Sequence, residues 1–369
     1  MPTDRQELLE AVAAMLPSIQ DESAKLDAAA KFPQESFEWL RKVGALRAAL
    51  PKHLGGFGFG YGAQGAADLL KLFLLLGEGS LSVARLYEAH VNTLQLVCHY
   101  GGTALIKQCA EDASAGHLFA LWVTDPPKGG LILRRGPDGS ILEGGKAFCS
   151  GAGVATRALV TAATENGIRM LIIGLVPETR VMPSEIKLNG MRAAITGSVD
   201  LSGISVSPDS FLGEVGDYLR EPVFSAGAWR GSAAALGGLT ALLKIHRNEI
   251  LERQRASDPH QQARFGQLVL AHETARLWMN QAALLGCLED DSAEVVVAYI
   301  NLARLAVETA CLDAMRLTQR GLGLGAFMAG HSAERICRDL STYLRQPAPD
   351  ETLAKAAEHY FHGDLPGAR

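Results

Sequence analysis

The sequence lacks the signals of several large protein classes. Its 35 Lys and Arg against 40 Asp and Glu give a net charge of −5, which leaves no surplus of positive charge to neutralise phosphates. Nucleic-acid binding is therefore not expected. The longest apolar stretches, 72–76 and 231–243, are shorter than the ~18 residues that cross a bilayer, which predicts no membrane span. The N-terminus is acidic from its fourth residue and has no secretory pattern, which predicts residence in the cytoplasm.

Metal and disulfide chemistry also have no pattern to support them. The ten histidines show no metal-ligand spacing, so no metal site is expected. The six cysteines include no C-x-x-C pair, and their wide spacing suits neither a disulfide scaffold nor a zinc site. We expect reduced, mostly buried thiols at Cys98, Cys109, Cys149, Cys287, Cys311 and Cys337.

Common catalytic motifs are missing as well. There is no G-x-x-x-x-G-K-[ST], no H-E-x-x-H and no G-x-S-x-G, so a phosphate-binding loop, a zinc-protease helix and a serine-hydrolase elbow are unsupported. The G-L-G-L-G string at Gly321–Gly325 follows a helical pattern instead of a strand. A turn between two helices is therefore an alternative to a dinucleotide fingerprint.

The 369 residues divide into three segments with different hydrophobic patterns. Apolar residues recur at helical spacing over most of 1–116, beginning behind a capping-box pattern at Thr3 and Gln6. Short apolar runs over 117–216 alternate with turn signals at Pro137–Gly139 and Asn166-Gly167, which predicts antiparallel hairpins. Long helical patterns fill 217–369, one of them behind a start signal at Asp258.

These patterns predict an α+β fold in three domains. The first is an N-terminal helical domain (1–116), the second a central antiparallel, barrel-like β domain (117–216), and the third a C-terminal bundle of four helices (217–369). Within the bundle we expect helices over 222–254, 259–287, 293–320 and 332–345, with a short helix at 350–361.

A few residues could carry chemistry, and each also has a purely structural interpretation. His90 lies on an otherwise apolar helix, where a polar ring needs either a hydrogen-bond partner in the core or a ligand. Asp125 and Lys128 flank the prolines that end the first apolar run and would otherwise belong to a solvated turn. Trp122 and Phe148 would line either the core or a cofactor site.

The domain order and several strings together resemble the acyl-CoA dehydrogenase superfamily of flavoproteins. The similarity extends to about residue 345. L-W-V-T-D-P resembles the V-T-E-P strand of typical members, and K-A-F-C-S-G resembles their K-x-W-I-T-N strand. The segment I-K-L-N-G-M-R-A-A-I-T-G-S-V-D-L looks like a closing strand, and E-R-I-C-R-D at Glu334–Asp339 looks like the last bundle signature.

The resemblance implies a flavin between the β domain and the bundle, FAD with FMN as the alternative, and a small-molecule substrate. It assigns the polar edge of the ring to Trp122, Val123 and Thr124, with further contacts at Phe148 and Ser150. In such proteins a neighbouring subunit helps to hold the cofactor diphosphate, which implies a homodimer or homotetramer. The residues that match this role are Arg264, Gly323 and Gly325.

The sequence departs from the family where the catalytic base is expected. Dehydrogenases of this family carry a glutamate eight residues after the Arg-Asp signature, and here that position is Pro347. The family's alternative position, near Ala228–Arg230, also has no carboxylate. The loop T-D-P-P-K-G-G lacks the serine and aspartate that help to seat CoA. The resemblance therefore implies a divergent acyl-CoA dehydrogenase-like enzyme without the standard base.

Two alternatives follow from the same residues. D-P-H-Q-Q-A-R-F-G-Q-L and R-D-L-S-T-Y are similar to the superfamily branch of monooxygenases, which use reduced flavin and oxygen and depend on a flavin-reductase or electron-transfer partner. That branch places histidines near the flavin, and His90 and Gln346 occupy the matching regions here. The third interpretation is a catalytically silent relative that acts as an interaction module.

Overall fold

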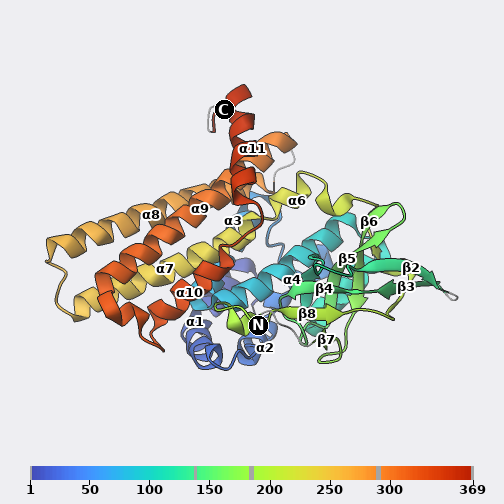
Figure 1. Cartoon of the computed structure of the whole chain (residues 1–369), viewed down its shortest axis with the longest axis horizontal. Helices are drawn as coiled ribbons and strands as arrows, with labels where there is room; N and C mark the ends of the chain where they lie inside the picture. The colour runs from blue at the N-terminus through green and yellow to red at the C-terminus, as the bar shows by residue number, and fades with distance from the viewer. Residues whose placement is uncertain (1, 137–138, 183–186, 288–291, 367–369) are drawn as a thin grey trace.

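The computed structural model describes residues 2–136, 139–182, 187–287 and 292–366, and Figure 1 shows the whole chain. Helices come first, then strands, then helices again. This order agrees with the predicted α+β fold. The first helices are α1 (Arg5–Asp27), α2 (Gln34–Lys42), α3 (Gly62–Gly79), α4 (Leu81–Tyr100) and α5 (Thr103–Ala115).

Helix α1 begins one residue later than the capping pattern indicates. Its N-cap is Asp4, whose carboxylate accepts a hydrogen bond from the Glu7 N–H at 2.9 Å. The Glu7 carboxylate in turn accepts from the Thr3 N–H at 2.7 Å. The prediction that Thr3 and Gln6 form the box is therefore wrong, because an aspartate one position further on is the stronger cap. Gly44, which follows the end of α2, has a φ of 80°, a left-handed conformation that glycine adopts readily.

The strands form two sheets. The larger has the order β10-β6-β5-β2-β3-β9, with β1 also paired to β5, and the smaller has the order β4-β8-β7. Most pairs are antiparallel as predicted, but β1 and β2 both lie parallel to β5. The strands are β1 (Phe119–Trp122), β2 (Ile132–Gly136), β3 (Gly139–Glu143), β4 (Gly145–Cys149), β5 (Arg157–Thr164), β6 (Gly167–Gly174), β7 (Val181–Met182), β8 (Gly197–Asp200), β9 (Ser205–Val206) and β10 (Phe211–Leu212).

The predicted hairpins are found where the chain is described. β5 and β6 pair from Arg157 to Thr164, with Thr164 opposite Gly167 across a two-residue turn. β2 and β3 pair with Gly136 opposite Gly139, while Pro137 and Asp138 of the predicted turn lie outside the described residues.

The larger sheet is buried on both faces. Along β5, Ala158 and Val160 belong to the core shared with the smaller sheet, whereas Leu159 packs with Leu94 of α4 and Ala110 of α5. Successive strand side chains point to opposite faces, so one strand contributes to two cores. The sheet is thereby fixed against α4, whose other residues line the cavity described below.

The C-terminal helices pack directly on the N-terminal ones. One hydrophobic core contains buried residues of α1, α3 and α4 together with residues of α7 to α10. In Figure 1, α11 stands away from the other helices. These helices are α6 (Val223–Ala226), α7 (Trp229–Glu252), α8 (Pro259–Leu285), α9 (Ala293–Leu322), α10 (Ser332–Tyr343) and α11 (Pro349–His362).

One of these helices also meets the length and composition of a membrane span. The segment Ala293–Phe327 reaches a mean hydropathy of 1.6 over its most apolar window, 39% of which is buried. Its buried residues, among them Ile300 and Val307, belong to the same core as α7 and α8. The helix is thus the core helix of a bundle, and the absence of a membrane span stays a prediction.

Candidate functional site

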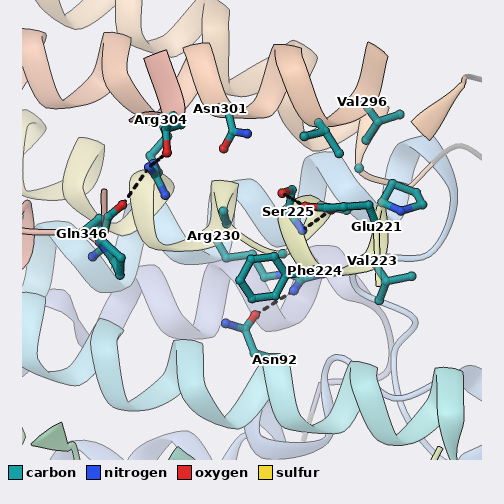
Figure 2. Close-up of a pocket in the computed structure, with 18 of the residues that line it drawn as sticks. Asn92, Glu221, Val223, Phe224, Ser225, Arg230, Val296, Asn301, Arg304 and Gln346 are labelled. Atoms are coloured by element: carbon teal, nitrogen blue, oxygen red, sulfur yellow. Dashed lines mark hydrogen bonds between the residues drawn. The ribbon is translucent and has the colours of Figure 1, made fainter. Parts of the chain in front are cut away.

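A cavity of about 2920 Å³ lies between the strands and the bundle. It is lined by the ends of β1 and β4, by one face of α4, by the start of α7, by the end of α10, and by parts of α9 and α11. Figure 2 shows part of this cavity, where Arg230 of α7 is hydrogen-bonded to Asn92 of α4. The cavity is at the junction where the sequence resemblance places a flavin.

The β side of the cavity is formed by predicted site residues. Val123, Thr124, Phe148 and Ser150 all line it, and Thr124 is exposed there. The Phe148 ring is 53% exposed, on a backbone with a φ of 53°. A non-glycine residue rarely adopts a positive φ, so the surrounding structure must impose this conformation, which leaves the ring outside the core. The structure therefore brings four of the five predicted contacts together.

Trp122, the fifth of these residues, does not line the cavity. Its side chain is 2% exposed, and its indole Nε1 donates to the Ser150 carbonyl at 2.9 Å. The Ser150 hydroxyl is 3.3 Å from the Thr196 hydroxyl, which also lines the cavity. Trp122 thus supports the wall from behind by fixing the backbone of Ser150.

A buried lysine fixes the other end of this wall. The Lys146 side chain is 1% exposed, and its ammonium group donates to the Asp125 carboxylate at 2.6 Å, the Thr161 hydroxyl at 3.1 Å and the Val123 carbonyl at 3.3 Å. Burial of an ammonium group is tolerated only where its donors are satisfied. Asp125 therefore has a partner in the core, and Val123 and Thr124 are held where β1 meets the cavity.

The helical side of the cavity carries a chain of polar side chains. The buried Glu88 carboxylate accepts from the Tyr343 hydroxyl at 2.8 Å, from Arg85 at 2.8 Å and from the Asn92 amide at 3.3 Å. Arg230 donates to the Asn92 amide oxygen at 2.7 Å. Three elements are joined in this way: α4 supplies three of the residues, and α7 and α10 one each.

Burial shifts the pKa values of two of these hydrogen-bonded side chains. It raises the pKa of the Tyr343 hydroxyl well above 10, an effect that the neighbouring Glu88 reinforces, so Tyr343 is a neutral donor. Burial also lowers the pKa of Arg230 to about 10, although Glu88 and Tyr61 favour the charged form. At neutral pH Arg230 thus still carries its positive charge.

His90 lies in the core and does not line the cavity. It is fully buried, its Nδ1 accepts from the Phe119 N–H at 3.2 Å, and its Nε2 lies 2.6 Å from the Leu46 carbonyl. Burial lowers the pKa of His90 to about 4, so the ring is neutral at pH 7 and donates from Nε2. This geometry matches the structural alternative, a hydrogen-bonded core histidine.

Gln346 lines the cavity beside Pro347, the position where family members carry a glutamate. The Gln346 amide donates to the Tyr343 carbonyl at 2.8 Å. The Pro347 carbonyl accepts from Arg304 of α9 at 3.3 Å. This segment connects α10 to α11 and closes one side of the cavity without offering a carboxylate from position 347.

Arg264, Gly323 and Gly325 are absent from the described cavity lining. Gly323 and Gly325 follow α9, beside the α7–α8 connection, where Arg253 donates to the Leu322 carbonyl at 3.1 Å. This end of the bundle is the one far from the strands in Figure 1.

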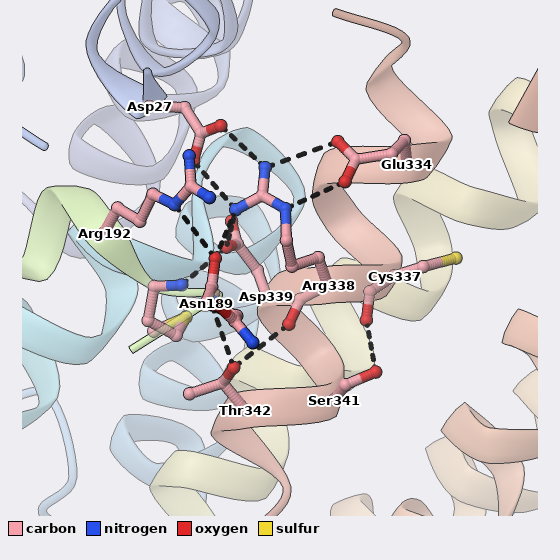
Figure 3. A network of polar contacts seen from close by, with 11 residues as sticks. Asp27, Asn189, Arg192, Glu334, Cys337, Arg338, Asp339, Ser341 and Thr342 are labelled. Carbon is pink, nitrogen blue, oxygen red and sulfur yellow. Dashed lines mark hydrogen bonds and ion pairs between the residues drawn. The ribbon is translucent and has the colours of Figure 1, made fainter. Parts of the chain in front are cut away.

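The Arg-Asp signature clamps a loop of the β region onto the bundle (Figure 3). Arg338 bonds the Asp27 carboxylate at 2.6 Å and the Asn189 carbonyl at 2.8 Å, and Asp339 accepts from the Met191 N–H at 2.6 Å. Met191 lines the cavity. The signature therefore positions a part of the cavity wall and does not itself reach the cavity.

Sequence reasoning missed Glu88, Asn92, Arg230 and Tyr343. A signal for two of them was present, because Arg85, Glu88 and Asn92 are spaced three and four residues apart and share one face of an otherwise apolar helix. Arg230 and Tyr343 had no comparable signal. Within the described residues no group of His, Cys, Asp and Glu could hold a metal ion, and all six cysteines are free.

No protein-family model matches the chain. Among solved structures, a glutaryl-coenzyme A dehydrogenase complex superposes with a TM-score of 0.85 at 20% identity, covering 98% of this chain and 96% of the other. KijD3 in complex with FMN and an amino-sugar nucleotide has a TM-score of 0.82 at 20% identity, covering 100% and 96%. The chain has the acyl-CoA dehydrogenase fold. The resemblance to this superfamily is thereby confirmed at the level of the fold.

Two curated relatives share this similarity in sequence. The amino sugar nitrososynthase DnmZ of Streptomyces peucetius is 27% identical over 257 residues, and a very long-chain specific acyl-CoA dehydrogenase of Mus musculus is 25% identical over 380 residues. The alignments cover 67% and 92% of this chain. They cover 63% and 54% of the relatives, so the chain spans little more than half the length of each.

Proposed function

We propose that this chain is a flavin-dependent oxidoreductase that oxygenates a small molecule, using flavin reduced by a partner. The cofactor would be FAD or FMN, held at the β wall of the cavity. The residues there suit a flavin: Phe148 offers a ring face, and the exposed Thr124 and the Ser150 hydroxyl offer hydrogen bonds to its polar edge. Fixed donors at the polar edge stabilise the charge of a reduced ring.

The observation that supports this proposal is that the Glu88 carboxylate is already fully engaged in hydrogen bonds. Removing the α-proton of a thioester requires a carboxylate free to accept it. Glu88 is the buried carboxylate of the described cavity lining, and it already accepts from Tyr343, Arg85 and Asn92. Other carboxylates of that lining, such as Glu221 and Glu294, are exposed to solvent. Position 347 offers a proline. Oxygenation needs no such base, because reduced flavin supplies two electrons to O₂, one oxygen atom enters the substrate and the other leaves as water.

The chain's own residues would then bind and shield the reactants. Thr124, Phe148 and Ser150 would orient the ring from one side. On the other side, the hydrogen bonds around Glu88 would hold α4, α7 and α10 together. Amines are the first substrate class to test, because DnmZ is described as an amino sugar nitrososynthase. The compartment remains a proposal as well, and we propose the cytoplasm.

The second candidate is a divergent acyl-CoA dehydrogenase. It is favoured by the alignment with the very long-chain specific acyl-CoA dehydrogenase over 92% of this chain. An anaerobic experiment separates the two. We expect acyl-CoA thioesters to leave the flavin spectrum unchanged, whereas a flavin reductase with NAD(P)H removes the visible absorbance and O₂ restores it. Bleaching by a thioester alone would instead identify a dehydrogenase, and a protein that takes up no flavin would identify an interaction module.

We also propose that the active form is a homodimer or homotetramer. Arg264, Gly323 and Gly325 are not among the described residues that line the cavity of their own chain. Large apolar side chains are exposed on the same elements, namely Val269, Leu270, Leu277, Leu312, Leu324 and Phe327. A second copy covering this surface would bury them and bring Arg264 towards its cofactor.

A further inference from the structure

The deep part of the cavity holds more positive than negative charge. Arg85 and Arg230 both line it, and Glu88 is the buried carboxylate beside them. Other charged residues of the lining, such as Arg220, Glu221 and Glu294, are exposed and face solvent. Charges in water are screened, whereas charges sheltered from water are not. The sheltered end of the cavity therefore has a net positive charge.

The two arginines differ in their partners. Arg85 lies 2.8 Å from the Glu88 carboxylate and forms an ion pair with it. Arg230 instead donates from Nη1 to the neutral amide oxygen of Asn92 at 2.7 Å. Its Nε is buried and has no hydrogen-bond partner among the described residues. The buried Nε is out of reach of a ligand, so an anion in the cavity would accept from the terminal nitrogens, whose described hydrogen bond leads to a neutral amide.

The place of Arg230 in its helix favours the same ligand. It is the second residue of α7, a helix of 24 residues, and Gly227 and Ala228 just before it also line the cavity. The N-terminal end of a helix carries a partial positive charge, which adds to the attraction of the guanidinium for an anion.

We propose that Arg230 binds an anionic oxygen group of the substrate, a carboxylate or a phosphate. This inference rests on the proposed function, since it places the substrate in the cavity that would hold the flavin. The substrate class is then a small molecule whose reacting atom lies within the cavity while its acidic group is anchored between α4 and α7. Bidentate recognition by a guanidinium suits either carboxylate or phosphate.

The test is calorimetric titration of the flavin-saturated protein, so that the phosphate of the flavin does not compete. The probes are glutarate, inorganic phosphate and glutaramide, a neutral analogue of glutarate. We expect at least one anion to bind tenfold or more tightly than glutaramide. Preference for glutarate would assign the carboxylate class, and preference for phosphate the phosphate class. Equal affinity for all three probes would overturn the inference.

Variants locate the binding. We expect Arg230→Gln to weaken anion binding at least tenfold and Arg230→Lys to retain part of it. Arg220→Gln is the matched control, because Arg220 lines the same cavity but is exposed; it should change the affinity less than twofold. Glu88→Gln should tighten binding, since it removes the opposing charge. Unchanged binding in Arg230→Gln, or loss of flavin in place of loss of anion, would overturn the inference.

The two proposals fail in different ways. If the protein takes up no flavin, the proposed function is wrong, and the same titration of the flavin-free protein still decides whether Arg230 binds anions. If the flavin binds but anions show no preference for Arg230, the proposed function stands and the substrate class is wrong.

Discussion

Lys146 and Asp125 form an ion pair whose two members lie in different surroundings. The lysine side chain is 1% exposed, and the aspartate side chain is 54% exposed. Losing the aspartate would leave a charged group in the core, whereas losing the lysine would leave a charged group that water can reach. The two possible deletions of this pair therefore should not cost the same.

We predict that Asp125→Asn destabilises the protein more than Lys146→Met does. An uncompensated buried ammonium group costs roughly 2–4 kcal/mol. Removal of the ammonium group sacrifices its hydrogen bonds, at about 1–2 kcal/mol in total. Urea unfolding of both variants measures the difference. A greater loss of stability in Lys146→Met would show that the pair does not hold the wall in the way described.

Asp339 gives the fold a pH dependence. Burial raises the pKa of this carboxyl from 3.8 to about 6, although the Met191 N–H and Arg335 favour the charged form. Between pH 4 and 6 the folded chain thus keeps a proton that the unfolded chain has lost. The stability contributed by this group is complete below pH 4 and is lost as the pH rises through 6.

We predict that Asp339→Asn removes this dependence. The unfolding free energy of the wild type, relative to the variant, should fall by roughly 2–3 kcal/mol between pH 4 and pH 7. Chemical denaturation across that range tests this. If the difference rises with pH instead, Asp339 is charged in the folded protein and its ion pairs with arginine outweigh its burial.

Some residues that line the cavity were predicted from the sequence and others were missed, for physical reasons. Thr124, Phe148 and Ser150 stand in short strings whose local order places them at the ends of strands. Arg230 and Tyr343 reach Asn92 and Glu88 only because α7 and α10 pack against α4. Such long-range contacts leave no trace in local spacing.

At the scale of elements, helices α3 and α7 come into close backbone contact at two glycines. A Cβ on Gly77 would lie 2.1 Å from the Ala234 carbonyl oxygen, and one on Gly237 would lie 2.4 Å from that of Leu74. Both contacts are with backbone, which cannot move aside without shifting a helix. The N-terminal and C-terminal helices therefore depend on these glycines for their shared core.

We predict that Gly77→Ala destabilises the protein by roughly 1–3 kcal/mol, because the helices must separate. Gly266→Ala in α8 is the matched control. No atom of the described residues lies within 4 Å of its Cβ position, and alanine should stabilise this helix by about 0.5–1 kcal/mol. Thermal unfolding compares the two. Equal shifts of the same sign would contradict the close approach of α3 and α7.

Element boundaries were predicted well where local signals set them. Asp258 caps α8 as expected, accepting from His260 and Gln261. The parallel pairing of β1 with β5 was not predicted, because it joins segments almost forty residues apart, Phe119 opposite Arg157. Turn signals specify hairpins, and no local signal specifies a parallel neighbour.

At the scale of the whole molecule, the proposed homo-oligomer predicts that a residue outside the cavity affects flavin binding. Arg264→Ala should weaken flavin retention, although Arg264 is not part of the cavity lining described within one chain. We expect the flavin dissociation constant to rise about tenfold, as for loss of one charge-assisted contact. Equilibrium dialysis measures this, and light scattering gives the oligomeric state. A monomer with unchanged flavin binding in the variant would refute the assembly.

The central claim is that a flavin binds against the β wall of the cavity, and the most direct measurement is the flavin affinity of the Thr124→Val, Ser150→Val double variant. The control replaces Ser205 and Thr309 by valine, two exposed residues that do not line the cavity. We predict that the purified wild type and the control show the visible spectrum of a bound flavin, and that the double variant binds it at least tenfold more weakly. Equal binding in all three proteins, or a colourless wild type that takes up no added flavin, would contradict the account.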